Sequence, residues 1–194
     1  MAIILASKSP RRRELLQTMG IEHFEVRPTS GPETLPAAGA SPAETVKAIC
    51  AGKAAEAART AAPDDIVIAA DTLVFLDGKP LGKPADQADA RRMLRALSGR
   101  THTVWTGVAV SKNGRTDIRA VGTEVRFRPM TDAEIDSYVA TGEPMDKAGA
   151  YGIQGRGCVY IEGIRGDYFN VMGLPVSTLY TMLQAAGNGD EKQP

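Results

Sequence analysis

The pattern of apolar and polar positions predicts a chain in which strands and helices alternate. Ile3 to Ala6 is an apolar run long enough for one buried strand, and residues 66–76 are the most apolar stretch of the chain. Further strands are expected at residues 24–27, 101–110, 116–127 and 159–162, and helices at residues 10–20, 42–61, 87–97, 132–141 and 175–186. This alternation is typical of an α/β protein.

Capping and turn residues place the boundaries of these elements. Ser9 followed by Pro10 begins the first helix, because serine is a good N-cap and proline a good first helical residue. Ser41 and Thr131 each precede a glutamate by three residues, which is the capping-box pattern. The segment 112–115, Lys-Asn-Gly-Arg, predicts a hairpin turn. Together these signals predict a mixed sheet layered by helices and divided by a cleft.

Length and composition favour a single domain at residues 1–187. The chain has 194 residues, of which 43% are hydrophobic, and this is ample for a core. The sequence shows no internal repeat and no linker. The polar residues 188–194 are expected to form a disordered tail.

The charge and the cysteine content exclude several classes of protein. Lys and Arg together number 23, as do Asp and Glu, so the net charge is zero. Proteins that bind nucleic acid through its phosphates are usually basic, so we expect a local site for a small anion and no nucleic-acid partner. Cys50 and Cys158 cannot form a disulfide framework, and His23 and His102 offer no zinc-ligand spacing.

The N-terminal apolar run is too short for an export signal, and Asp71 interrupts the longest apolar stretch. We therefore expect a cytoplasmic protein without a membrane span.

A basic segment at the start of the first helix is the first candidate site. Arg11, Arg12 and Arg13 occupy the first helical turn, where the macrodipole opposes each exposed cation by about 0.3–1 kcal/mol. An anion would reverse that sign. Backbone N–H groups, the hydroxyls of Ser7 and Ser9 and the three guanidinium groups together predict a phosphate-binding site. A solvated basic helix end is the alternative.

Asp71 is the second candidate, because it stands inside the most apolar stretch. An isolated buried charge costs several kcal/mol, so this carboxylate must be paired, hydrogen-bonded or bound to a cation. A base or a metal ligand fits that requirement, and so does an aspartate paired with a structural arginine.

Three other charged positions are less specific. Lys53 lies beside the apolar stripe of the helix at 42–61, so its ammonium group can reach a cleft or extend to solvent. Lys83 precedes a proline and is held extended, which suits a cation presented to a ligand. Glu33 lies in a loop rich in proline and glycine, where solvent exposure is the ordinary state of a glutamate.

The segment 143–157 is rich in glycine and alanine. With few large side chains, its backbone can come close to a flat ligand. A flexible surface loop is the alternative.

The order of these motifs resembles the Maf-like nucleotide pyrophosphatases. The pattern S-x-S-P-R-R at residues 7–12 is similar to the opening of that family, and blocks at residues 67–84, 97–108 and 143–175 are similar to its later motifs. The resemblance covers most of the chain. It implies the elongated, two-lobed fold shared with inosine-triphosphate pyrophosphatases, often as a homodimer.

The resemblance also implies an activity, which is hydrolysis of a nucleoside triphosphate between its α and β phosphates. It implies that Asp71 is the proton acceptor, that Lys53 and Lys83 contact phosphate, and that Glu33 and Asp71 hold a divalent cation, Mg²⁺ or Mn²⁺. Glu33 lacks the acidic residues that usually precede it in the family, so its match is less secure.

The base is expected to be a pyrimidine. Residues 150–155 resemble the branch of the family that acts on dTTP and UTP, and Arg11, Thr72 and Gln154 correspond to its specificity positions. An amide offers one acceptor and two donors, which can match the N3–H donor and the O4 acceptor of uracil or thymine. A Gln154 that bridges two loops is the alternative for this residue. The branch that favours 7-methyl-GTP is the alternative for the chain.

Two rival functions belong to other classes. A nucleotidyltransferase also combines a strand, a small-residue loop, an arginine and a later Lys-Pro, but it would need a Gly-rich loop in place of residues 6–9. A nucleotide-binding regulator of septum formation without turnover is the non-enzymatic alternative.

Overall fold

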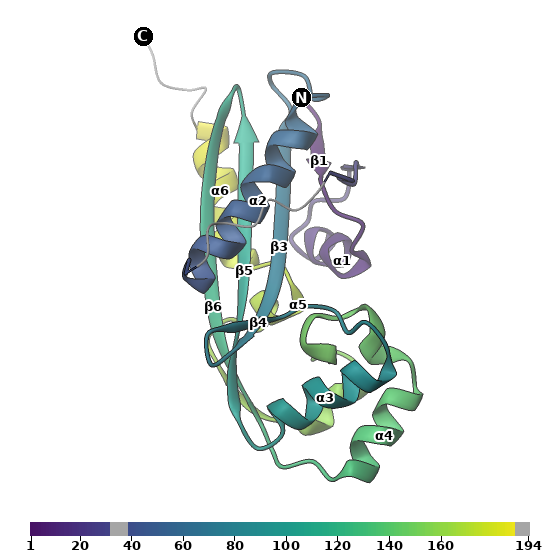
Figure 1. The fold of residues 1–194 in the computed structure, drawn as a ribbon. Helices are drawn as coiled ribbons and strands as arrows, with labels where there is room; N and C mark the ends of the chain where they lie inside the picture. The colour runs from purple at the N-terminus through teal and green to yellow at the C-terminus, as the bar shows by residue number, and fades with distance from the viewer. Residues whose placement is uncertain (32–38, 189–194) are drawn as a thin grey trace. The chain divides into compact units, whose positions relative to one another are not determined.

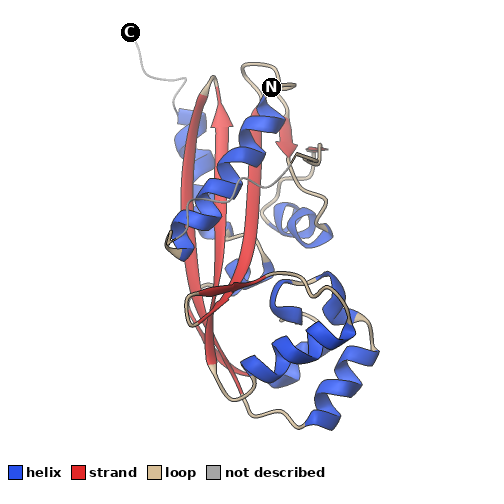
Figure 2. Cartoon of the chain, in the orientation of Figure 1, coloured by secondary structure: helices blue, strands red, loops and turns tan. Residues whose placement is uncertain are grey.

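The computed structural model describes residues 1–31 and 39–188. The strands are β1 (Ile3–Leu5), β2 (Glu25–Val26), β3 (Ile66–Leu76), β4 (Lys79–Leu81), β5 (Thr101–Lys112), β6 (Arg115–Phe127) and β7 (Ile161–Arg165). The helices are α1 (Pro10–Thr18), α2 (Pro42–Ala58), α3 (Gln87–Leu97), α4 (Asp132–Ala140), α5 (Tyr168–Met172) and α6 (Val176–Asn188), with short 3₁₀ helices η1 (Glu143–Asp146), η2 (Ala148–Ala150) and η3 (Arg156–Tyr160). Figure 1 labels the α-helices and these strands other than β2 and β7, and Figure 2 distinguishes helix from strand.

Within the described part of the chain the strands form one seven-stranded sheet in the order β2-β1-β3-β5-β6-β7, with β4 paired to β3. The strand β1 is parallel to β2 and to β3, whereas β4 is antiparallel to β3 and β7 is antiparallel to β6. The sheet is therefore mixed, and the prediction of an α/β fold with a mixed sheet and helices is confirmed.

The chain folds into two compact units, and three long strands contribute residues to both. Unit 1 contains Met1–Asp71, Thr106–Val121 and Gly173–Pro194, and unit 2 contains Thr72–Trp105 and Gly122–Met172. The boundary falls within β3, β5 and β6. A single domain over residues 1–187 stays a prediction.

Small side chains form the core of unit 1 between α2 and the sheet. The helix α2 lies across the strands in Figure 1 and buries Cys50, Ala54 and Ala57 against the sheet. A methyl group on Gly107 of β5 would stand 2.4 Å from the Val46 carbonyl oxygen, well inside contact distance. The absence of a side chain there lets α2 pack directly on the strand.

Larger side chains fill unit 2. Residues of α3 and α4 pack with β5 and β6, and the buried set includes Leu94, Leu97, Phe127, Ile135 and Tyr138. Aromatic rings contribute strongly to this core because each buries a large apolar area.

The capping signals are confirmed. The Ser9 hydroxyl accepts a hydrogen bond from the Arg12 backbone N–H of α1. Ser41 and Thr131 each form a complete capping box with the glutamate three residues later. The helix α3 and the strand β3 span the predicted residues.

Several boundaries are corrected. The last strand was expected at residues 159–162, but residues 156–160 form the 3₁₀ helix η3 and β7 runs over Ile161–Arg165. The exposed fraction of Val159 is 60%, so its β-branched side chain marks no buried strand position. The helix α5 was not expected. Asn188, expected as the first tail residue, is the last residue of α6, and residues 189–194 lie outside the described residues.

Across residues 1–31 and 39–188, no helix has the length and apolar character that crossing a membrane requires.

Candidate active site

The loop between β1 and α1 places two serines at the start of the helix. Ser7 is 7% exposed, and its Oγ accepts hydrogen bonds from the Ser9 backbone N–H at 3.2 Å and from Arg12 Nη1 at 3.0 Å. Both lone pairs of this hydroxyl are therefore used, and the group is left as a hydrogen-bond donor. Within the described residues no acceptor for the Ser7 hydroxyl hydrogen is present. An anion at this helix start would supply one.

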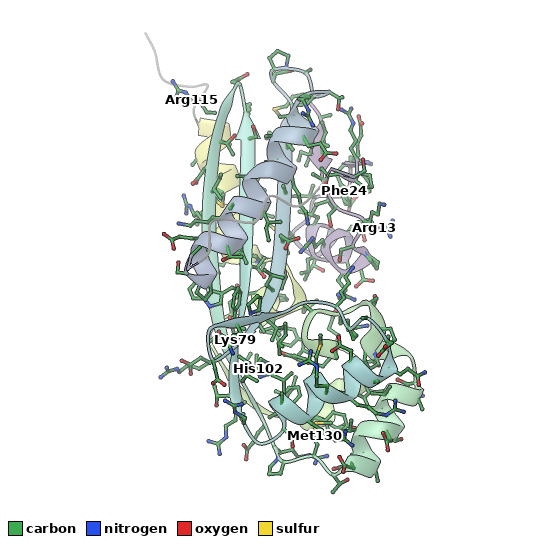
Figure 3. All side chains as sticks on the ribbon, in the orientation of Figure 1. Arg13, Phe24, Lys79, His102, Arg115 and Met130 are labelled. Carbon is green, nitrogen blue, oxygen red and sulfur yellow. The ribbon has the colours of Figure 1, made fainter. Side chains whose placement is uncertain are left out.

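The three arginines of the first turn differ in their surroundings. Arg12 bridges two segments, because Nε donates to the Gly173 carbonyl oxygen at 2.8 Å while Nη1 donates to Ser7. Burial of the guanidinium group lowers the pKa of Arg12, and the negative charge of Asp71 partly offsets that fall. Arg11 is half-buried, whereas Arg13 is exposed on α1 (Figure 3). The sequence treated the three as equivalent phosphate ligands, but the recorded contacts give Arg12 a bridging role.

Asp71 and Lys53 form an ion pair within unit 1. Lys53 Nζ of α2 contacts Asp71 Oδ1 of β3, and the two side chains are 21% and 12% exposed. The sequence required a partner for the Asp71 charge, and Lys53 is such a partner, while the charge of Asp71 also acts on Arg12. Lys53 reaches Asp71 because the small side chains of α2 let the helix approach the strand. A carboxylate, two cationic groups and a donor hydroxyl thus gather in unit 1.

Cys50 lies one turn before Lys53 on α2 and is fully buried. Its Sγ donates to the Ala69 carbonyl oxygen at 3.2 Å, and burial raises the pKa of the thiol to about 12. The thiolate is the nucleophilic form of cysteine, so this buried thiol is a core residue and not a nucleophile.

The remaining candidates lie in unit 2 or outside the described residues. Thr72 follows Asp71 in β3 and is half-buried, Lys83 is exposed after β4, and Gln154 is exposed in the segment between η2 and η3. Glu33 lies outside the described residues.

His102 belongs to the core of unit 2. His102, which is labelled in Figure 3, is 2% exposed. Its Nε2 lies 2.7 Å from the Tyr151 hydroxyl oxygen. The centroids of its ring and of the Phe127 ring are 5.1 Å apart in an edge-to-face arrangement. Burial lowers the pKa of His102 to about 4. The imidazole is therefore neutral near pH 7, and it contacts Tyr151 of the segment 143–157.

Sequence reasoning missed two groups. The Gly173 carbonyl, which receives Arg12, is a backbone atom and carries no sequence signal. The sequence assigned no role to Glu143, the first residue of the segment 143–157, but its carboxylate accepts hydrogen bonds from three other residues of unit 2. The sequence did contain one signal for this role, because an acidic residue stands at the start of a segment whose glycines leave backbone N–H groups accessible.

A divalent cation fits the donor chemistry of Asp71 only in part. Mg²⁺ is usually bound by one or two carboxylates together with substrate phosphates and water. Over the described ranges there is no group of three or more His, Cys, Asp or Glu side chains that could hold a metal by themselves. The donor set therefore suits a cation whose remaining ligands come with the substrate.

Sequence comparison finds a family model and named relatives that match most of the chain. Residues 2–186 match a family model described as Maf-like protein. A dTTP/UTP pyrophosphatase of Moorella thermoacetica is 49% identical over 191 residues, covering 95% of each chain. One from Bacillus cytotoxicus, with the same name, is 47% identical over 186 residues and 96% of each chain.

A solved structure supports the fold. The HAM1 protein from Coxiella burnetii superposes with a TM-score of 0.55 at 18% identity, covering 95% of this chain and all of that one. At this identity the likeness concerns the fold alone.

Proposed function

Since this chain belongs to the Maf-like protein family, we propose that it hydrolyses dTTP and UTP to the monophosphate and pyrophosphate. The observation that carries the proposal is the buried cluster of unit 1, in which the Asp71 carboxylate, the Lys53 ammonium and the donor hydroxyl of Ser7 accompany a helix N-terminus. The two relatives named as dTTP/UTP pyrophosphatases support the choice of substrate.

The start of α1 is the proposed phosphate site. Backbone N–H groups and the Ser7 hydroxyl lie there, and Arg11 and Arg13 belong to the same first turn, so all three kinds of donor are proposed to bind phosphate. Arg12 acts through Ser7, because it donates to the Ser7 oxygen and leaves the hydroxyl hydrogen for another acceptor. Charge-assisted contacts of this kind would neutralise the triphosphate.

Asp71 is the proposed proton acceptor. The water oxygen bonds to phosphorus as the α–β bridging P–O bond breaks, pyrophosphate leaves, and the water proton passes to the Asp71 carboxylate. Lys53 shields that carboxylate by its ion pair. A bound triphosphate would offer Lys53 a second anion, and the carboxylate oxygen that it contacts would then be available to water.

A divalent cation, Mg²⁺ or Mn²⁺, is proposed as the cofactor. Such an ion, when bound, would help to neutralise the charge that develops on the leaving group. Asp71 is the described residue proposed to hold it, and Glu33 is proposed as a second ligand on the family resemblance alone.

Three residues of unit 2 are proposed to contact the nucleotide on the same resemblance. Lys83 would bind phosphate, while Thr72 and Gln154 would select the base. Their half-buried or exposed state leaves them accessible to a ligand. A homodimer in the cytoplasm is proposed on the family resemblance.

Product analysis tests the proposal. The purified chain is incubated with Mg²⁺ and each of a panel of nucleoside triphosphates, and pyrophosphate and orthophosphate are measured separately. We expect pyrophosphate and the monophosphate from dTTP and UTP. Orthophosphate with a diphosphate would show cleavage at the β–γ bond, and nucleotide binding without product would favour a regulator.

A further inference from the structure

The Glu143 carboxylate organises the backbone that carries Gln154. Its Oε1 accepts hydrogen bonds from the Tyr138 hydroxyl at 2.8 Å and from the Gly157 N–H at 3.3 Å. Its Oε2 accepts one from the Arg156 N–H at 2.9 Å. The Tyr138 hydroxyl in turn accepts from the Gly152 N–H at 3.1 Å. Two side chains from α4 and η1 thus bind the backbone on both sides of Gln154.

The glycines of this segment make room for these two side chains. A methyl group on Gly155 would lie 2.3 Å from Glu143 Oε1, and one on Gly157 would lie 2.7 Å from the Tyr138 hydroxyl oxygen. Real side-chain carbon atoms do not come so close to other atoms. The sequence attributed these glycines to the approach of a flat ligand, but the structure assigns them to the approach of Glu143 and Tyr138.

The charge state of Glu143 suits this role. Burial would raise the pKa of the carboxyl group, but the hydrogen bonds from the Arg156 N–H, the Tyr138 hydroxyl and the Gly157 N–H outweigh it and lower the pKa below its ordinary value. An ionised carboxylate accepts at both oxygens, whereas an amide would direct an NH₂ group against a backbone N–H. Glutamine is therefore a poor substitute here, although its size is the same.

The Gln154 side chain is accessible to a ligand. It is exposed, and within residues 1–31 and 39–188 it has no hydrogen-bond partner, so the alternative of a bridge between loops finds no support there. Because the backbone on both sides of Gln154 is held, binding of a ligand costs freedom only in the Gln154 side chain and not in the backbone that carries it.

We propose that Glu143 and Tyr138 are positioning residues that hold residues 152–157 so that the Gln154 amide can read a pyrimidine base. The proposal rests on the proposed function and names what sets its specificity. Neither side chain needs to touch the nucleotide. Both act through the Gly152, Arg156 and Gly157 N–H groups.

The test separates recognition of the base from recognition of the phosphates. Glu143→Gln and Tyr138→Phe are compared with the wild type for the KM of UTP and for inhibition by inorganic tripolyphosphate, which has phosphates but no base. We expect the KM of UTP to rise about tenfold in Glu143→Gln, which is about 1.4 kcal/mol, and by less in Tyr138→Phe. The inhibition constant of tripolyphosphate should stay unchanged in both.

Two matched variants control for loss of stability. Glu134→Gln removes a carboxylate of α4 that bonds Arg128 and Thr131, and Tyr160→Phe removes the hydroxyl of the ring that packs on Tyr138 at 5.4 Å. We expect both controls to leave the KM of UTP unchanged even where the melting temperature falls. Hydrogen exchange should be faster at Gly152 in Tyr138→Phe, and at Arg156 and Gly157 in Glu143→Gln.

The outcomes are distinct. An unchanged KM of UTP in Glu143→Gln, or an equal change in the tripolyphosphate constant, would overturn the positioning role while the pyrophosphatase activity stands. A wild type that releases no pyrophosphate from UTP would overturn the proposed function, and the positioning role with it.

Discussion

At the scale of single residues, Asp71 and Lys53 lie 18 positions apart in the sequence and meet as a partly buried ion pair. The two charges compensate each other. A carboxylate in an apolar strand needs a cation, and a lysine on a packed helix needs an anion. Removing one partner of such a pair leaves the other uncompensated. The pair therefore contributes to the fold as well as to the proposed chemistry.

Asp71→Asn should lower kcat about a hundredfold or more while KM changes little, because it removes the proton acceptor without changing the shape of the side chain. Stability should fall modestly, since Lys53 loses its counter-ion. Steady-state kinetics with UTP measures the first effect and urea denaturation the second.

Asp65→Asn is the matched control. Asp65 directly precedes β3 and accepts hydrogen bonds from the Ala2 and Ala62 N–H groups. This change should reduce stability and leave kcat as it is. A variant at Asp71 that kept most of the wild-type kcat would show that the base is another group.

His102 should make the protein less stable in mild acid. Its pKa falls from 6.5 to about 4 on folding because the ring is buried beside Tyr151 and Phe127. Between these values only the unfolded chain takes the proton, so stability is lost as pH falls from about 6.5 towards 4. The loss between pH 7 and pH 5 should be on the order of 2 kcal/mol.

Urea denaturation at both pH values in the wild type, His102→Gln and the exposed control His23→Gln measures this loss. His102→Gln is less stable throughout, but its dependence on pH over this interval should be shallower. Equal pH dependence in His102→Gln and the wild type would rule out His102 as the source.

At the scale of elements, the approach of α2 to β5 depends on one glycine. A methyl group at Gly107 would stand 2.4 Å from the Val46 carbonyl oxygen and 2.8 Å from its carbonyl carbon. Both are backbone atoms, so the conflict cannot be relieved by rotating a side chain. The helix itself would have to move, and it carries Lys53.

Gly107→Ala should therefore cost about 1–3 kcal/mol of stability, which is typical of overpacking, and should also lower kcat through displacement of Lys53. Gly163→Ala in β7 is the matched control, because a methyl group there meets no atom within 4 Å. Urea midpoints of the two variants that agreed within error would refute the close packing of α2 on β5.

At the scale of the whole molecule, the expected preference for pyrimidine nucleotides rests on the family branch and on the amide of Gln154. A methylated guanine carries a delocalised positive charge, which would favour a carboxylate or an aromatic stack, and no acidic residue occurs between Lys147 and Val159. We expect dTTP and UTP to be hydrolysed at least tenfold better than 7-methyl-GTP, a preference of about 1.4 kcal/mol.

Side-by-side measurement of kcat/KM for the three nucleotides tests this preference. Gln154→Glu should reduce it, because a carboxylate cannot donate to O4. A wild type that preferred 7-methyl-GTP would reverse the branch assignment and leave the pyrophosphatase assignment in place.

The sequence by itself determined most of the elements, their caps and the candidate residues, but not α5 or the start of β7. Ser9, Ser41 and Thr131 predicted three helix starts correctly, because an N-cap acts within four residues of its own position. The apolar run that became β3 predicted both a buried strand and the need for a partner at Asp71. The order of the motifs identified the family.

Only the tertiary structure decided which partners these residues have. It paired Asp71 with Lys53, joined Arg12 to the Gly173 carbonyl, and showed that Glu143 and Tyr138 occupy the space that the glycines leave. Each of these contacts depends on atoms brought together by packing, and many of those atoms are backbone N–H and C=O groups that every residue possesses. Such groups carry no signal in a sequence until the fold places them.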